Sequence, residues 1–183
     1  PPQHQQQYEI NYDLVSALLE QQHREDQPHH QNGSGGRITS KLSVSLIIPS
    51  DAVQLSRYQF RIRQQLDFFT SQQEDADSSI QGRKKKVVLG QVGLRCRHCS
   101  DLPISQRGRG AVYYPHKLSG VYQAAQNMAT SHLMDACQII PVEVRDELIM
   151  LRDRHETATG GKQYWIDACR ALGLEEDVDG LKF

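Results

Sequence analysis

Four residues in two short pairs constrain this chain more than any other feature of its sequence. The first pair is Cys96 and Cys99, separated by two residues; the second is His132 and Cys137, separated by four; and 32 residues lie between the pairs. Cysteines at the first spacing can converge on one ion from a tight turn, and the second spacing is little more than one helical turn. Three thiolates and one imidazole complete a tetrahedral set. The sequence therefore predicts one structural Zn²⁺ held by these four side chains.

Other residues compete for the same roles. His98 and His116 are alternative fourth ligands, and Cys169 is a more distant one, although its helical spacing with neighbouring apolar residues places it in a core. In another interpretation the cysteines of the first pair are merely small buried residues and the histidine is a hydrogen-bonded core residue. That interpretation does not explain why a short, polar turn flanked by arginines contains two cysteines.

The same ligand set argues against catalysis. A site with four protein ligands has no open coordination position for water, so the predicted zinc is structural. Zinc deaminases also use a Cys-x2-Cys pair, but with a proline before its first cysteine, where this chain has Arg95. The cysteines that could act as nucleophiles are those that the metal would bind. We therefore expect no enzyme, no catalytic residue and no small-molecule substrate.

Charge is distributed unevenly along the chain. Residues 1–82 contain six basic and ten acidic side chains, residues 83–137 contain nine and two, and residues 138–183 contain six and ten, so a segment of +7 lies between two segments of −4. The positive segment coincides with the predicted metal site, which favours nucleic acid, and DNA in particular, as the partner. The residues predicted to contact phosphates are Arg83, Lys84, Lys85, Lys86, Arg107 and Arg109.

Two further features bear on location. The run of residues 83–86 has the composition of a nuclear localisation signal. The first residues lack the pattern of a secretory signal, and no run of about 18 apolar residues occurs. We therefore expect a protein of the nucleus, or otherwise of the cytoplasm, with no membrane partner.

Changes in composition divide the chain into four parts. Residues 1–36 are rich in Gln and His and are predicted to be a disordered tail with a short amphipathic segment at residues 8–19. Residues 37–82 are predicted to be a strand-helix lead-in that ends in an acidic loop. Residues 83–173 are predicted to be the zinc-binding helical domain, and residues 174–183 an acidic tail.

Hydrophobic periodicity predicts the elements within these parts. Alternation over residues 42–48 and the apolar run at residues 87–89 predict strands. Apolar residues at spacings of three and four predict helices at residues 58–69, 118–135, 142–154 and 162–172.

The first predicted helix has a recognisable start. Ser56 and Gln59 have the spacing of a capping box, and Arg57, Arg61 and Arg63 are expected on the solvated side of the helix. Together these elements predict an α+β fold, a small zinc-stabilised domain of short strands, a zinc knuckle and about four helices.

Five short blocks of residues form a pattern that extends beyond the metal ligands. They are Leu55-Ser56-x-Tyr58-Gln59, Leu89-Gly90-Gln91-Val92-Gly93-Leu94-Arg95-Cys96-Arg97-His98-Cys99, Tyr122-Gln123-Ala124-Ala125-Gln126-Asn127-Met128, His132-Leu133 and Gly161-Lys162-x-Tyr164-Trp165. This pattern resembles an uncharacterised, zinc-finger-like family of algal, diatom-type proteins. The resemblance covers about two-thirds of the chain and implies no established activity.

The ligand order has two looser resemblances. A Cys-x2-Cys pair followed by a helix with His132-Leu133 and a final ligand is similar to BED-type DNA-binding fingers and to the framework of peptide-binding BIR domains. The 32-residue gap is long for a BIR domain, and the spacing to Cys137 is one of the variants of a BED finger. These resemblances imply DNA binding, or alternatively a protein–protein interaction module with a structural zinc. The net charge of −1 for the whole chain favours the alternative.

Overall fold

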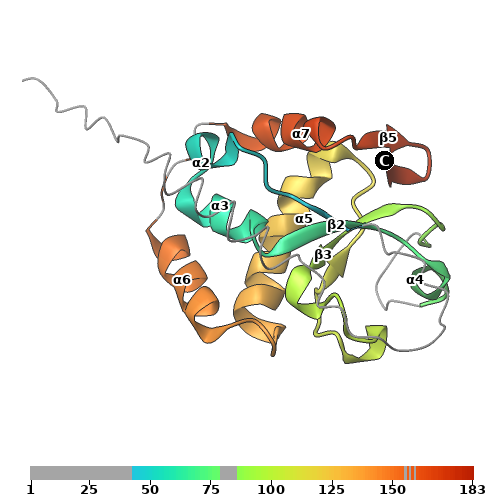
Figure 1. Cartoon of the computed structure of the whole chain (residues 1–183), viewed down its shortest axis with the longest axis horizontal. Coiled ribbons are helices and arrows are strands. Elements are labelled where there is room, and N and C mark those ends of the chain that lie inside the picture. Colours follow the sequence, from blue (N-terminus) through green and yellow to red (C-terminus); the bar gives the residue numbers. More distant parts are fainter. Residues whose placement is uncertain (1–42, 79–85, 155, 157, 159) are drawn as a thin grey trace, which may run out of the picture. The chain divides into compact units, whose positions relative to one another are not determined.

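The computed structural model describes residues 43–78, 86–154, 156, 158 and 160–183. The predicted tail with its amphipathic segment lies outside the described residues, as do both ends of the predicted lead-in and the basic residues Arg83, Lys84 and Lys85. The described residues form a mixed structure of helices and a small antiparallel sheet (Figure 1), which confirms the predicted α+β class.

One layer of this structure is a four-stranded antiparallel sheet with the strand order β1-β2-β3-β4. In the central pair of strands, Leu66 lies opposite Cys96 and Phe68 lies opposite Leu94, and all four side chains are buried. Because alternate residues of a strand share a face, this register gives the sheet one continuous apolar face. The strands are β1 (Ser43–Ser45), β2 (Leu66–Thr70), β3 (Val92–Cys96) and β4 (Val112–Tyr113).

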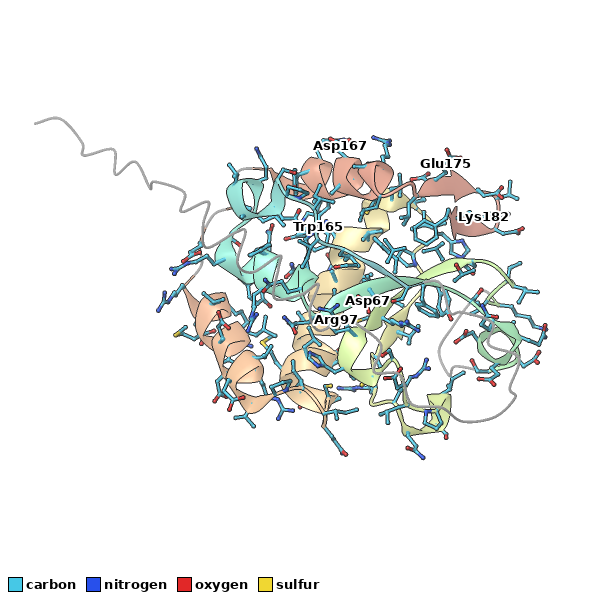
Figure 2. The ribbon with its side chains drawn as sticks, in the orientation of Figure 1. Asp67, Arg97, Trp165, Asp167, Glu175 and Lys182 are labelled. Atoms are coloured by element: carbon cyan, nitrogen blue, oxygen red, sulfur yellow. The ribbon has the colours of Figure 1, made fainter. Side chains whose placement is uncertain are left out.

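Helices pack against the apolar face of the sheet and share one core with it. Trp165 (Figure 2) is fully buried in that core, and its ring meets the Tyr122 ring edge-on with centroids 5.6 Å apart. None of the described helices is long and apolar enough to cross a membrane. The main helices are α3 (Arg57–Arg63), α5 (Val121–Met128) with its π-helical continuation η4 (Ala129–Ala136), α6 (Val142–Asp153) and α7 (Gly161–Ala171).

Three of the four predicted helices are confirmed. The short helix η3 (Leu118–Gly120), α5 and η4 together span the helix predicted at residues 118–135. Pro141 immediately precedes α6, as expected from its preference for helix starts. Gly173 follows α7 with a φ of 85°, the left-handed conformation that commonly ends a helix.

The helix predicted at residues 58–69 is wrong in its second half. Ser56 caps α3 as predicted, because its Oγ accepts the Gln59 N–H at 3.2 Å, but the helix ends at Arg63 and Leu66 begins strand β2. Apolar residues at 62, 66 and 69 fit a helix, whereas the alternation of Leu66 and Phe68 with Asp67 fits a strand. Pairing with β3 decides the outcome, and that pairing is not visible in the local pattern.

Three shorter predictions also need correction. Residues 87 and 88 have no regular secondary structure and Leu89 lies in a turn, so the strand expected there begins only at Val92. The predicted acidic loop contains the helix α4 (Gln73–Asp77). Residues 174–183, predicted as an acidic tail, form a hairpin of β5 (Glu175–Asp177) and β6 (Gly180–Lys182), with Leu174 and Leu181 buried.

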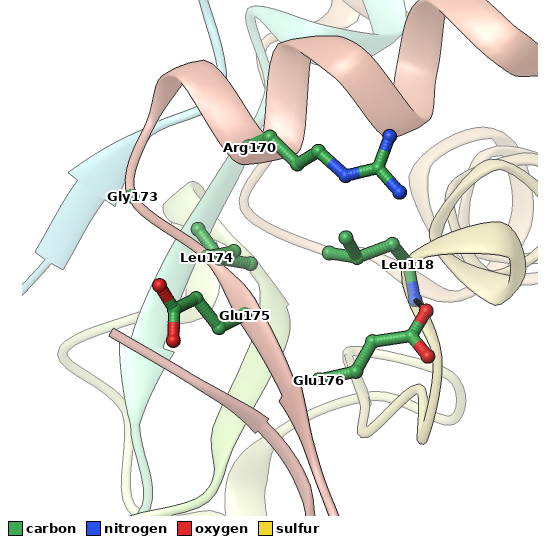
Figure 3. Close-up of a pocket in the computed structure, with 6 residues that line it drawn as sticks. All are labelled: Leu118, Arg170, Gly173, Leu174, Glu175 and Glu176. Atoms are coloured by element: carbon green, nitrogen blue, oxygen red, sulfur yellow. Dashed lines mark hydrogen bonds between the residues drawn. The ribbon is translucent and has the colours of Figure 1, made fainter.

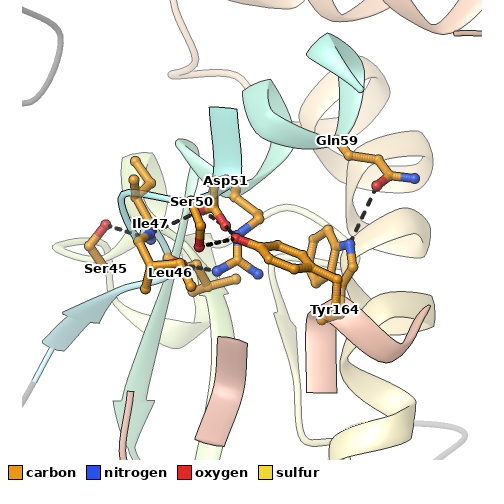
Figure 4. A network of polar contacts seen from close by, with 10 residues as sticks. Ser45, Leu46, Ile47, Ser50, Asp51, Gln59 and Tyr164 are labelled. Atoms are coloured by element: carbon orange, nitrogen blue, oxygen red, sulfur yellow. Dashed lines mark hydrogen bonds and ion pairs between the residues drawn. The ribbon is translucent and has the colours of Figure 1, made fainter. Parts of the chain in front are cut away.

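Arg63 was expected on a solvated helix face, but its side chain is only 1% exposed. Its Nε donates to Asp51 Oδ2 at 2.8 Å, and Tyr164 OH donates to Asp51 Oδ1 at 2.6 Å (Figure 4). The Arg63 guanidinium also stacks on the Trp165 ring, 4.8 Å from its centroid. This buried network joins the short helix α2 (Asp51–Gln54) and α3 to α7. A buried charge requires such partners, and these come from positions far apart in the sequence.

Candidate metal centre

The structure brings the four predicted metal ligands together. One ligand atom from each of Cys96, Cys99, His132 and Cys137 lies within 4.8 Å of the other three, and no side chain of the four is more than 2% exposed. Cys96 ends β3, and Cys99 ends the single 3-10 turn η1 (Arg97–Cys99). His132 lies in η4, and Cys137 follows it. These four side chains could hold one metal ion.

The spacing of the ligand atoms fits a tetrahedral metal site. A zinc–sulfur bond of about 2.3 Å places two sulfurs of a tetrahedral site about 3.8 Å apart. Cys137 Sγ lies 3.7 Å from Cys99 Sγ and 4.0 Å from Cys96 Sγ, and His132 Nε2 lies 3.4 Å from Cys99 Sγ. These three separations are close to those of a tetrahedral zinc site, and all four ligand atoms lie within 4.8 Å of one another.

Backbone hydrogen bonds on both sides of the first pair hold its turn in place. The Cys96 N–H donates to the Ala111 carbonyl oxygen at 2.9 Å, and the Arg97 N–H donates to the Gln65 carbonyl oxygen at 3.0 Å. The first bond ties the turn to the loop that leads to β4, and the second ties it to the residue before β2. The two thiols are thus positioned by the sheet itself.

A π-helical turn positions the second pair. The Cys137 N–H donates to the His132 carbonyl oxygen at 2.7 Å, which is the hydrogen bond between residues five apart that defines a π-turn. The sequence predicted a separation of little more than one helical turn. The wider π-turn was missed, although such turns commonly mark functional sites in helices.

A second hydrogen bond orients the histidine ring. His132 Nδ1 lies 3.1 Å from the Arg109 carbonyl oxygen. A carbonyl oxygen only accepts, so Nδ1 carries the proton and Nε2 keeps its lone pair directed toward the sulfurs. This is the arrangement that metal-binding histidines commonly show.

The environment of the sulfurs shows why a cation suits the site. The hydrogen bond from Cys96 lowers the pKa of the Cys137 thiol, and the backbone N–H groups of Ile139 and Ile140 act in the same direction. The shared hydrogen bond and burial raise the pKa of Cys96, and burial raises that of Cys99. Burial disfavours negative charge on these sulfurs, and a divalent metal would supply the positive charge that stabilises all three as thiolates.

The rival ligands lie elsewhere. His98 Nε2 contacts Gln65 Oε1 at 2.9 Å, and neither His98 nor His116 belongs to the ligand cluster. Cys169 is buried in the core as predicted, and burial raises the pKa of its thiol to about 12.

Two glycines between the ligand pairs have a packing role that the sequence did not predict. A Cβ atom at Gly108 would lie 2.5 Å from the Ala136 carbonyl oxygen, and one at Gly110 would lie 2.7 Å from Ser131 Oγ. Gly110 also has a φ of 76°. The sequence predicts phosphate contacts at Arg107 and Arg109, yet the glycines next to them let the loop pack directly on η4. The sequence signal that could have indicated this close packing is the presence of two glycines, Gly108 and Gly110, between the two ligand pairs.

The predicted phosphate contacts have different environments. Lys86 is exposed, and Arg109 has 81% of its side chain exposed while pairing with Asp135 at 3.7 Å. Arg107 donates from Nε to the Leu102 carbonyl oxygen at 2.9 Å, so this side chain braces the loop after the first cysteine pair. The other three predicted contacts, Arg83, Lys84 and Lys85, lie outside the described residues.

Two arginines of the first cysteine pair's turn, one just before Cys96 and one just after it, lie on the other side of the sheet from the core. Arg97 pairs with Asp67 at 3.7 Å (Figure 2), and the Arg95 guanidinium stacks on the Phe69 ring, 5.0 Å from its centroid. Arg95 is buried, and this burial lowers the pKa of its guanidinium.

A surface pocket lies away from the metal ligands, between the end of α7 and the start of η3 (Figure 3). Glu176 reaches across it, and its Oε1 accepts the Leu118 N–H at 2.8 Å, which holds the hairpin against the start of η3. The pocket contains none of the predicted site residues. Its lining consists of Leu118, Arg170, Gly173, Leu174, Glu175 and Glu176.

Comparisons with models of known protein families, with curated proteins and with solved structures found no match to this chain.

Proposed function

We propose that this chain is a zinc-stabilised, non-enzymatic module that binds nucleic acid, and that its single zinc is structural. The observation that carries the structural role is the closed ligand set: four protein ligands, each at most 2% exposed, leave no coordination position that faces solvent. The three-sulfur, one-nitrogen donor set favours zinc over hard cations such as Mg²⁺ and Ca²⁺.

The nucleic-acid part of the proposal is supported by charge. The segment of residues 83–137 carries +7, and its exposed side chains include Lys86, Arg109 and Lys117. Exposed cations release counterions when they contact phosphates, whereas the buried or braced arginines of the same segment stabilise the fold.

Metal analysis tests the zinc proposal. Purified protein should contain one zinc per chain, and Cys96→Ser and His132→Ala should each lose it. His116→Ala is the matched control, because His116 lies outside the ligand cluster, and it should keep the metal. A well-folded wild-type protein without metal would contradict the proposal.

A salt titration tests the nucleic-acid proposal. Affinity for a duplex of random sequence should fall steeply with added salt, with a logarithmic slope of about −0.9 for each phosphate neutralised. Charge-removing substitutions at Lys86 and Arg109 should make that slope shallower. Weak binding with no salt dependence would show that nucleic acid is not the partner.

A protein partner is the second candidate, and one observation favours it. Ile139 and Val142 are 47% and 63% exposed just after Cys137, and Met150 on α6 is 47% exposed. Exposed apolar side chains can mark a protein-binding surface. Salt-insensitive capture of one protein, lost on Val142→Asp, would favour this candidate.

A nuclear location belongs to the main proposal and is supported by the composition of residues 83–86. A fluorescent fusion should accumulate in the nucleus, and replacing Lys84, Lys85 and Lys86 by alanine should exclude it. An unchanged distribution of that variant would remove the support.

A further inference from the structure

The helix that carries the histidine ligand has an unusual surface. Residues 118–134 contain no Asp, Glu, Lys or Arg. By contrast, the exposed positions of α6 include Glu143, Asp146 and Arg152, and those of α7 include Lys162 and Asp167. Solvated helix faces are normally charged, as these two are. The α5–η4 surface is therefore suited to contacts other than those with water alone.

Asp135, exposed near the end of η4, is acidic, but the exposed residues of this helix before it form one stripe. They are spaced by four, four and three residues, so they lie on one side of the helix. Every side chain of the stripe is uncharged, and each is able to form hydrogen bonds. We call this set the polar stripe; it consists of Ser119, Gln123, Asn127 and Thr130.

Two amides at the centre of the polar stripe are held by each other. Gln123 Nε2 donates to Asn127 Oδ1 at 2.9 Å. The pair keeps the Gln123 carbonyl oxygen as an acceptor and the Asn127 amide hydrogens as donors. This is the complement of the N7 acceptor and N6 donor that adenine presents in the major groove. Thr130 Oγ1 donates to the Gln126 carbonyl oxygen at 3.1 Å, which leaves its methyl group as an apolar contact of the kind that suits thymine.

The metal centre places a cation beside one end of the polar stripe. His132 Nδ1 donates a hydrogen bond to the Arg109 carbonyl oxygen, and Gly110, which follows Arg109, packs against Ser131. The Arg109 side chain is 81% exposed, and its partner Asp135 is 69% exposed at a distance of 3.7 Å. Such an exposed pair is weak, so a phosphate could replace the carboxylate.

A second cation lies at the other end. Lys117 is exposed and immediately precedes η3. The helix rises about 16 Å from Ser119 to Thr130. The major groove of B-DNA is about 12 Å wide, so a helix of this length with a cation at each end can reach both phosphate backbones.

We propose that α5 and η4 form a recognition helix that enters the major groove of duplex DNA, with Gln123 and Asn127 reading base edges and Arg109 and Lys117 contacting phosphates. This inference rests on the proposed nucleic-acid function. It adds the surface of the protein that contacts the bases, and it specifies duplex DNA as the ligand. The deep, narrow major groove of A-form RNA does not admit a helix, so duplex RNA of the same sequence should bind no better than a scrambled DNA duplex.

The test begins with selection of bound duplexes from a random DNA pool by the wild-type protein. The affinity ratio between the selected duplex and a scrambled one is then compared among variants. The double variant Gln123→Ala/Asn127→Ala should lower this ratio about tenfold or more while zinc content and binding to the scrambled duplex stay unchanged. Arg109→Ala/Lys117→Ala should weaken binding to both duplexes and make the salt slope shallower by about two.

The chain provides a matched control for the amide pair. On α7, the exposed Gln163 donates from Nε2 to Asp167 Oδ1 at 3.0 Å, also across four residues. Gln163→Ala should leave the affinity ratio unchanged. An equal loss of the ratio in this control would overturn the inference.

The outcomes separate this inference from the proposed function. If the wild-type protein binds duplexes in a salt-dependent way but the amide double variant keeps the full affinity ratio, the recognition helix is wrong and nucleic-acid binding stands. Tighter binding of duplex RNA than of DNA would have the same meaning. If the wild-type protein binds no duplex, both proposals fail.

Discussion

Gly108 shows how closely the loop between the two ligand pairs packs on the helix that carries His132. A Cβ atom at this position would lie 2.5 Å from the Ala136 carbonyl oxygen, and backbone cannot move aside as a flexible side chain could. We expect Gly108→Ala to lower the free energy of unfolding by about 1–3 kcal/mol and to weaken zinc binding, because the loop and η4 must separate.

Urea unfolding and a competitive zinc chelator measure the two effects. Gly120→Ala is the matched control, because the nearest atom to its added Cβ is 3.6 Å away and its φ is −85°. That variant should be as stable as the wild type. Equal behaviour of the two variants would mean that the loop tolerates displacement from η4.

Tyr164 gives a pH-dependent prediction. Burial raises its pKa to about 12, and the hydrogen bond to Asp51 acts in the same direction. A free tyrosine has a pKa of about 10, so folding favours the protonated phenol; this stabilisation is fully present below about pH 10 and is lost as the pH rises toward 12. Tyr164→Phe should cost about 1–2 kcal/mol of unfolding free energy at neutral pH, since it removes a hydrogen bond to a carboxylate.

The stability difference between wild type and Tyr164→Phe should stay constant from about pH 7 to pH 9 and shrink above about pH 10. Urea unfolding at a series of pH values measures it. A difference that stays constant up to pH 12 would contradict the prediction.

For single residues, the sequence predicted the roles that depend on a short spacing between neighbours. It missed the roles that depend on partners distant in the sequence. The ligand set could be found because each pair is local: two residues separate Cys96 from Cys99, and four separate His132 from Cys137. The burial of Arg63 could not be found, because its stabilising partners, Asp51 and the Trp165 ring, lie 12 and 102 residues away in the sequence.

Among the elements, β2 is the one that a helical period misassigned. The apolar residues at 62, 66 and 69 satisfy a helical period, and only the pairing of Leu66 with Cys96 and Phe68 with Leu94 selects a strand. The helices at 118–135, 142–154 and 162–172 were predictable because a long amphipathic repeat, a proline start or a glycine end leaves no second interpretation.

The C-terminal hairpin is a second element that the sequence did not reveal, since acidic residues dominate its composition. Leu181 is fully buried in the common core, and β6 packs against β3. We expect Leu181→Ala to lower the free energy of unfolding by about 2–5 kcal/mol. Val178, at the turn of the hairpin, is 89% exposed. Val178→Ala should therefore change the free energy of unfolding by less than about 0.5 kcal/mol.

Urea unfolding of the two variants tests whether the hairpin belongs to the cooperative unit. If Leu181→Ala were as stable as Val178→Ala, the segment would be a dispensable tail after all.

For the whole molecule, the fold class was predictable and the sheet order was not. Strands of three to five residues with the order β1-β2-β3-β4 depend on pairing between segments separated by a helix or a long loop. Composition and periodicity contain no information about such pairing. The metal ligands connect the parts that this pairing assembles, because they come from the end of β3, from the turn after it and from the far end of the helical layer.

Metal removal should therefore affect the entire described core. The helix that carries His132 packs on α7, where the Tyr122 and Trp165 rings meet at 5.6 Å, and Cys96 pairs with Leu66 in the sheet. A structural zinc that is bound only by the folded state adds its binding free energy to folding. We expect a chelator to lower the free energy of unfolding by several kcal/mol, on the order of 5, in a transition that stays cooperative.

The fluorescence of Trp165, the only tryptophan of the chain, reports on the core away from the sulfurs, and far-ultraviolet circular dichroism reports on the helices. After chelation, both signals should unfold together at a lower urea concentration, and added zinc should restore the original midpoint. His116→Ala protein treated in the same way should behave like the wild type. If the Trp165 transition stayed at its original midpoint while the metal was lost, the zinc would stabilise only the loop between its ligands, and the ligand pairs would not couple the sheet to the helices.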